Sequence, residues 1–199
     1  LSCLDQHERS SFYLLEAQKR LSDKYAVTWL AADACRRTGN YQKAVELEQQ
    51  LIGLASDPET KAAHWLTIAD AAEALEAPDL AINALIQAGA AGCGDIADSR
   101  LAALYEARGD WDKRAEALER MKGRAKWDSQ ALTWLQGEAL WQHEDHEAAI
   151  QTFSGIASAL GRWRTHFGYE VTEDHTAHAH LLEEWAMATK DPGTHDALL

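Results

Sequence analysis

Histidine is concentrated near the end of the chain, in spacings at which two imidazole rings could share a ligand. Seven of the nine histidines lie after residue 142, and the pairs His143/His146 and His175/His178 are each three residues apart. That spacing places both rings of a pair on one face of a helix. A zinc site needs three or four ligands with supporting hydrogen bonds, yet His180 falls off the face of the second pair and no cysteine is nearby. We therefore predict no metal site, and the alternative is a surface that gains charge in acid.

Other patterns that carry chemistry are weak or missing. The segment Gly89-Ala-Ala-Gly-Cys-Gly94 has glycines spaced like those of a phosphate-binding loop, but such loops follow a strand or end in Lys-Ser/Thr. We interpret the segment as the end of a helix and a turn. The chain has no HExxH, GxSxG or Cys–His signature, and no two carboxylates stand out as acid and base. We predict that the chain is not an enzyme and binds no cofactor.

The charge and hydropathy of the chain exclude further classes of partner. With 19 basic and 32 acidic residues among 199, the formal net charge is −13, which opposes binding to nucleic acid or anionic lipid. The longest apolar run, Ala81 to Gly92, is interrupted by Asn83 and Gln87 and is shorter than the ~18 residues of a membrane span. We predict no nucleic-acid partner and no membrane span.

The elements that must position any site are helices. Valine occurs only three times, while alanine, leucine, glutamate and glutamine are abundant, a balance that favours helix over strand. Apolar periodicity and turn residues predict an opening helix at 6–22 and a final helix at 172–190. Between them we expect four helix pairs: 25–37 with 41–54, 60–75 with 78–89, 95–108 with 111–123, and 129–143 with 146–160.

The four pairs resemble the tetratricopeptide repeat (TPR) family. The third pair carries the most family residues, namely Leu101, Ala102, Tyr105, Gly109-Asp110-Trp111, Leu118 and Met121. The others offer Ala32, Gly39-Asn40-Tyr41, Ala44 and Leu51; Trp65, Ala69, Ala81 and Leu85; and Trp134, Gly137, Ala149 and Phe153. Ala44, Ala81, Arg114 and Ala149 are spaced by 37, 33 and 35 residues. The pattern departs from the family at Arg114, which replaces an alanine, and at the second turn, which lacks a glycine.

The resemblance implies an all-α fold, a right-handed α-solenoid of about four repeats with flanking capping helices. We assign the repeats to residues 25–59, 60–94, 95–128 and 129–161 within a repeat region of 25–160. Residues 1–24 are expected to be an N-terminal helix, a cap or part of a preceding repeat. Residues 162–199 are expected to be a C-terminal loop, helix and tail. Each pair is expected to bury its apolar stripe against the next.

The family resemblance also implies a binding groove lined by the first helix of each pair. The ligand-facing positions fall on Trp29, Asp33, Arg36, Arg37, Asp70, Glu73, Arg100, Glu106, Trp134, Glu138 and Trp141. Members of the family that clamp a carboxylate use lysine, asparagine and arginine at positions where this chain has Trp29, Asp33, Thr67, Ile96 and Arg100, so we predict no such clamp. Acids, aromatics and three arginines suit an amphipathic helix or an extended peptide with basic character.

Three functions follow as hypotheses. The first is a scaffold that binds a protein or peptide in the groove. The second is a structural segment of a larger bacterial scaffold for envelope secretion or polysaccharide export, which a first residue other than methionine favours. The third is a metal- or pH-responsive module built on the C-terminal histidines. The compartment, cytoplasmic or periplasmic, stays open.

Overall fold

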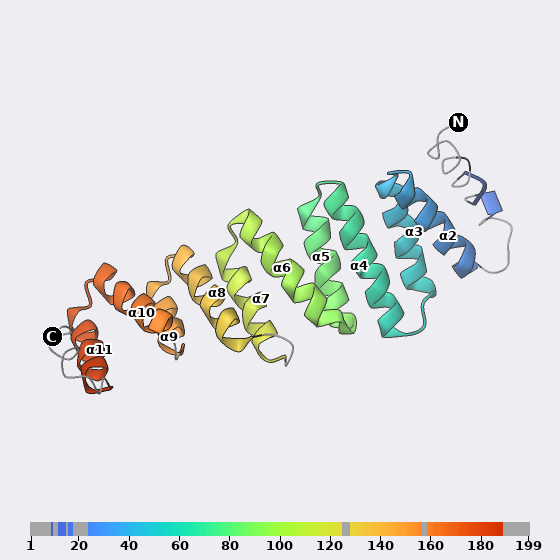
Figure 1. The fold of residues 1–199 in the computed structure, drawn as a ribbon. Helices are drawn as coiled ribbons and strands as arrows, with labels where there is room; N and C mark the ends of the chain where they lie inside the picture. The colour runs from blue at the N-terminus through green and yellow to red at the C-terminus, as the bar shows by residue number, and fades with distance from the viewer. Residues whose placement is uncertain are drawn as a thin grey trace. The chain divides into compact units, whose positions relative to one another are not determined.

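The structure is a computed structural model that describes residue 9, residues 12–14 and 16–17, and the ranges 24–124, 128–156 and 159–188. Every regular element in these ranges is a helix (Figure 1). The chain divides into two compact units, an N-terminal unit of Leu1–Leu104 and a C-terminal unit of Tyr105–Leu199. The division falls inside the predicted third repeat rather than at its edge.

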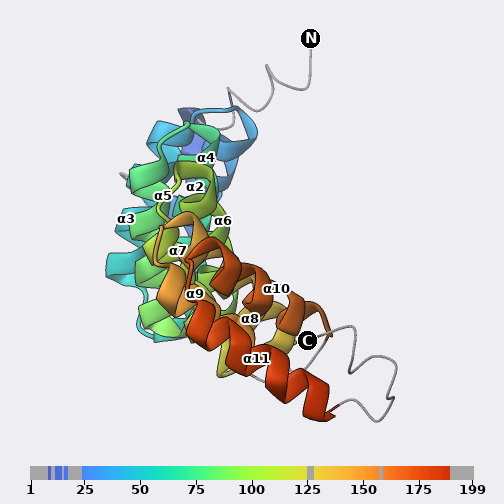
Figure 2. The same ribbon diagram turned by 90° about the vertical axis from the view of Figure 1, so that its left-hand side faces the viewer.

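The helices of each unit pack on their neighbours in chain order (Figures 1 and 2). The N-terminal unit contains α2 (Lys24–Arg37), α3 (Tyr41–Leu54), α4 (Pro58–Ala74), α5 (Pro78–Ala88), the short π-helix η1 (Gly89–Cys93) and the greater part of α6 (Gly94–Arg108). The C-terminal unit contains α7 (Trp111–Lys122), α8 (Ser129–Gln142), α9 (His146–Ser154), α10 (Ala159–Val171) and α11 (His175–Ala188). The predicted pairs are all present as helices. The predicted opening helix lies largely outside the described residues.

The sequence interpretation was wrong about the C-terminal region. The helix expected at 146–160 ends at Ser154, and the segment expected to be a loop from residue 162 belongs to helix α10. The final helix begins at His175 rather than at residue 172. Helices α10 and α11 therefore make a fifth pair. Helix α10 contains Gly161 and Gly168, and glycine disfavours a helix interior unless close packing requires it.

All five pairs turn in the same way. The first helix of each pair ends in one residue with left-handed backbone, which we call the turn residue: Gly39, Glu76, Gly109, Glu144 and Glu173, with φ of 76°, 54°, 72°, 65° and 58°. Each turn residue donates its amide to the carbonyl three residues back, and the next amide donates to the carbonyl five residues back. This is the Schellman arrangement that closes a helix C-terminus. The second turn, which lacks glycine, therefore has the same geometry with Glu76 in its place.

The turn residue provides a common numbering for the five pairs. Two positions form the crossing of a TPR-like pair, where small side chains let the two helices approach. One lies seven residues before the turn residue and the other lies five residues after it. Ala32 and Ala44 hold these positions in the first pair and Ala69 and Ala81 in the second, and all four are fully buried. Gly137 holds the first of them in the fourth pair, where an added Cβ would lie 2.5 Å from the buried ring of Phe153.

One stretch of the N-terminal half has the length and composition of a membrane-spanning helix. Residues Pro78–Arg108 form 31 consecutive helical residues with a mean hydropathy of 1.3 over the most apolar window. From the sequence we expected no apolar stretch as long as a membrane span, and by length and composition that expectation was wrong. The length is reached only by counting across Gly92, where φ is 114° and the path of the helix is kinked. Helix α5 also packs on α4, with Ala81, Ala84, Leu85 and Ala88 buried.

Candidate functional site

The predicted ligand-facing residues divide between the two units. Most of them lie ten, six or three residues before a turn residue, on one side of the first helix of a pair, which we call the first-helix face. Seven belong to the N-terminal unit: Trp29, Asp33, Arg36, Arg37, Asp70, Glu73 and Arg100. The other four belong to the C-terminal unit: Glu106, Trp134, Glu138 and Trp141. We describe each face within its own unit.

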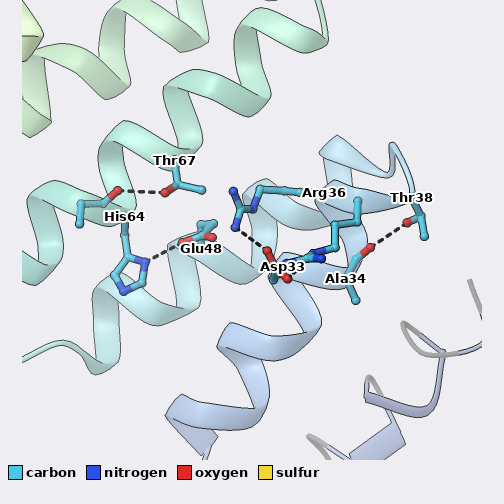
Figure 3. Close-up of polar contacts among 9 residues, drawn as sticks. Asp33, Ala34, Arg36, Thr38, Glu48, His64 and Thr67 are labelled. Atoms are coloured by element: carbon cyan, nitrogen blue, oxygen red, sulfur yellow. Dashed lines mark hydrogen bonds and ion pairs between the residues drawn. The ribbon is translucent and has the colours of Figure 1, made fainter. Parts of the chain in front are cut away.

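On α2, one carboxylate holds two guanidinium groups. Asp33 accepts from Arg36 Nη2 at 3.0 Å and from Arg37 Nε at 2.6 Å, one turn along the same helix (Figure 3). Arg36 is about one-third exposed, whereas Arg37 is well exposed. Thr67, at the facing position of α4, donates to the Ala63 carbonyl of its own helix. The carboxylate of Asp33 is therefore paired within α2, and the large apolar side chains that this helix exposes are Trp29 and Leu30.

Beneath this face, a chain of three polar side chains joins α2, α3 and α4 (Figure 3 shows its α3 and α4 members). His64 Nδ1 lies 2.6 Å from Glu48 Oε2, and His64 Nε2 lies 2.8 Å from the Tyr25 hydroxyl. When Nδ1–H donates to the carboxylate, Nε2 is free to accept from the hydroxyl of Tyr25. Glu48 and His64 are only 2% and 5% exposed.

Burial is the main influence on the pKa of Glu48, the carboxylate of these three side chains. Desolvation raises the pKa of Glu48 above its ordinary value, and the hydrogen bond and charge of His64 and the charge of Arg36 oppose the rise. A hydroxyl, an imidazole and a carboxylate in sequence resemble the proton relays of enzymes. Here the imidazole and carboxylate are inside the core, where a substrate cannot reach them. The arrangement can instead fix the positions of three helices relative to one another.

A second set of polar contacts, the ion pairs of Arg100, joins α4 to α6. Arg100 places Nη1 2.7 Å from Asp70 Oδ1 and Nη2 2.7 Å from Glu73 Oε1. Burial lowers the pKa of Arg100, but the hydrogen bonds and charges of Glu73 and Asp70 outweigh it, so the net effect is a raised pKa. Arg100 lies nine residues before its turn residue, and the two acids lie six and three residues before the preceding one.

An equivalent ion pair of an arginine with an acid of the preceding first helix is present in the C-terminal unit. Arg164 of α10 also lies nine residues before its turn residue, and its Nε lies 2.9 Å from Glu138 Oε1 on α8. Its guanidinium carbon lies 4.6 Å from the ring centre of Trp141 and 5.2 Å from that of Phe153. A cation held between a carboxylate and aromatic rings gains both charge pairing and cation–π attraction. Arg164 therefore fastens α10 to the preceding pair.

Comparison with known proteins identifies the architecture. Two crystal structures of MamA superpose with TM-scores of 0.51 at 18% sequence identity. The first match covers 75% of this chain and 80% of the MamA chain, and the second covers 77% and 92%. A MamA RS-1 double mutant gives 0.50 at 17% identity, over 81% and 92% of the two chains. No protein-family profile and no curated protein matches the chain. The fold is that of a TPR-like repeat protein.

Within these TPR-like repeats, the predicted site residues have different environments. Trp29 is 46% exposed. Trp134 packs against Phe153 with ring centres 5.3 Å apart, and Trp141 lies 4.4 Å from the ring of His146 as well as against Arg164. Glu106 pairs with Arg114 at 3.1 Å. Both tryptophans of α8 are thus engaged in packing within the C-terminal unit, and each predicted acid has a basic partner. Their assignment to a ligand groove stays a prediction.

The fifth TPR-like pair adds residues that the sequence interpretation missed. Trp163 of α10 occupies the position of Trp29 and Trp134, ten residues before the turn residue, and is 54% exposed. It stacks on Phe167 with ring centres 5.8 Å apart and an interplanar angle of 15°. The sequence contained a signal for this pair: Asp174 follows the turn residue, as Asn40, Asp110 and Asp145 do, and its carboxylate caps α11 at Ala177 N.

The histidines have partners different from those their spacing indicated. His178 contacts His166 on the neighbouring helix rather than His175 on its own, and His146 packs on Trp141. Among the residues that the structure describes, no three His, Cys, Asp or Glu side chains are placed to hold a metal ion. Arg114, which replaces the family alanine, lies with its guanidinium carbon 5.6 Å from the Trp111 ring.

Proposed function

We propose that the chain is a protein-binding scaffold whose first-helix face in the N-terminal unit receives a peptide or partner segment through Trp29. The exposure of Trp29 carries the proposal. Its side chain is 46% exposed and the adjacent Leu30 is 45% exposed, although α2 has Val27, Ala31, Ala32 and Cys35 to fill its own core. Tryptophan is the residue type most enriched at the energetic centre of protein interfaces.

The intramolecular ion pairs determine which chemical character we expect of the partner. Asp33, Asp70 and Glu73 all have arginine partners on the same face, so little uncompensated negative charge is left there. Apolar contact therefore contributes more than attraction to a basic peptide. A helix or extended segment with an apolar anchor against Trp29 and Leu30, and polar groups toward Arg37, fits this face.

Comparison of two alanine variants in affinity capture tests the proposal. Trp29→Ala removes the exposed indole on the first-helix face, and Ile86→Ala removes a side chain of similar exposure, 47%, from the second helix of another pair. With the full chain immobilised, we expect the captured partner to be lost with Trp29→Ala and kept with Ile86→Ala, while both variants retain the helical circular dichroism of the wild type. Equal capture by both variants would show that the site is elsewhere.

Trp141 and Glu138 serve this test less well. Both contact Arg164, which fastens α10 to the rest of the C-terminal unit. Their replacement would change packing and any binding together.

A further inference from the structure

The helix crossing of the fifth pair differs chemically from the others. The positions seven residues before and five after the turn residue hold Ala32 and Ala44, Ala69 and Ala81, Ala102 and Arg114, and Gly137 and Ala149 in the first four pairs. In the fifth pair they hold His166 and His178. Two imidazoles thus stand where three of the other pairs place two small side chains.

The two rings are in direct contact. His178 Nε2 lies 2.5 Å from His166 Nδ1, and the ring centres are 4.4 Å apart. A hydrogen bond at this distance needs one nitrogen with a proton and one with a free lone pair. The contact can therefore form when both rings are neutral or when one of them is charged. It cannot form when both are imidazolium, because both nitrogens then carry a proton and both rings a positive charge.

We propose that the His166–His178 crossing is an acid-sensitive joint, which holds α11 on α10 at neutral pH and releases it when both rings are protonated. Histidine is the side chain whose charge ordinarily changes between pH 5 and 8. Over residues 175–184, the part of α11 whose side chains the structure describes, no side chain is fully buried, which suits release. By contrast, α9 of the preceding pair buries Ala149, Ile150 and Phe153.

Charged groups of both signs lie near the crossing, and none of them removes the conflict between two protonated nitrogens. Arg162 and Glu170 lie one turn from His166 on α10, Asp174 caps α11, and His175 is the first residue of that helix. Glu147 of α9 lines a surface groove together with Asp174, Tyr169 and Ala177. The crossing therefore has three acids and two basic groups near it. Because Ala177 lies beside His178, release of α11 would also open this groove.

Amide hydrogen exchange of the full chain tests the joint. We compare the wild type, a His166→Ala/His178→Ala variant that restores a small crossing, and His180→Ala, which removes an exposed histidine of α11 whose ring lies 3.9 Å from Glu183. Protection of α11 is measured from about pH 7.5 to about pH 5, relative to α4 in the same sample, to remove the intrinsic pH dependence of exchange.

We expect α11 of the wild type and of His180→Ala to lose protection in acid, by up to about tenfold per pH unit once the second proton binds. The double alanine variant should keep its protection across the range. Constant protection in the wild type would overturn the proposal, and so would an equal loss in the double alanine variant. Nitrogen chemical shifts of the two rings give a second reading: at neutral pH, one of the two contacting nitrogens should be protonated and the other not. Two protonated nitrogens at neutral pH would also overturn it.

Discussion

Glu48 and His64 occupy core positions that the other pairs fill mainly with apolar side chains. Nine residues after the turn residue, where the first pair has Glu48, the others have Leu85, Leu118, Phe153 and Leu182. Twelve residues before it, where the second pair has His64, the others have Val27, Ala97, Leu132 and Gly161. Two polar residues thus replace apolar ones at sites that face each other across α3 and α4. Each requires the other, since a buried polar group without a partner destabilises the fold.

Replacement of both members should therefore be tolerated better than replacement of one. Glu48→Leu alone leaves His64 buried without its carboxylate and should lower the free energy of unfolding by about 3 kcal/mol. Glu48→Leu together with His64→Leu should recover at least half of that loss, because each leucine matches an equivalent position elsewhere in the chain. Equilibrium unfolding in denaturant measures both values. A double variant less stable than Glu48→Leu would contradict the interpretation.

The raised pKa of Glu48 also predicts a pH dependence. The pKa is higher in the folded state, so the contribution of Glu48 to stability is fully present below its unfolded pKa of about 4.3 and is lost as pH rises through the folded pKa. The free energy of unfolding of the wild type minus that of Glu48→Gln should therefore fall as pH rises above about 4.3. Denaturant titrations at several pH values measure it.

Glu46→Gln provides the control for that titration. Glu46 lies on the same helix but is half exposed and paired with Lys43. Its substitution should show no comparable fall between the same pH values. An equal fall in both differences would mean that burial of Glu48 is not the cause.

At the scale of the element, the effect of a glycine-to-alanine substitution on stability depends on how closely a neighbouring helix packs against that glycine. Gly53 in α3 has no atom within 4 Å of an added Cβ, so Gly53→Ala should stabilise the protein by about 1 kcal/mol through helix propensity. Gly137 in α8 is close to the fully buried ring of Phe153, which Trp134 and Arg164 hold in place. There the clash should exceed the propensity gain, and Gly137→Ala should destabilise by about 1–3 kcal/mol.

Thermal and denaturant unfolding of the two alanine variants measure these opposite signs. Stabilisation by both substitutions would show that Phe153 can move aside.

The elements also show which parts of the fold the sequence can predict. The first four pairs were predictable because apolar periodicity and small residues recur at a regular spacing. The fifth was not, because its crossing positions hold His166 and His178 instead of small residues, and because Gly161 and Gly168 lie inside α10, where helix propensity disfavours glycine. Their meaning is visible only in three dimensions, where an added Cβ on Gly168 would lie 2.5 Å from Ile150. The ion pairs of Arg100 and Arg164 were likewise hidden, since each joins different pairs.

At the scale of the whole molecule, net charge sets the class of partner. A chain with a formal charge of −13 repels the phosphate backbone, and the arginines of the first-helix face are already paired with carboxylates. We therefore expect no saturable binding to a labelled DNA duplex in fluorescence anisotropy, even at low salt, where phosphate contacts are strongest. Saturable binding that weakens steeply with added salt would contradict this expectation.

The shared turn has a consequence for how the chain can be cut and rejoined. Because all five loops close through the same two backbone hydrogen bonds, a segment running from one left-handed residue to the next is a cassette with matching ends. Excision of residues 145–173 would splice Glu144 to Asp174, so that the acidic helix cap again follows the left-handed residue. The side chains limit this freedom, because such a cassette carries Arg164 away from Glu138 and places His178 opposite Gly137. The backbone geometry of the turns would thus allow one helix pair to replace another, whereas the polar side-chain contacts between pairs fix the order of the pairs along the chain.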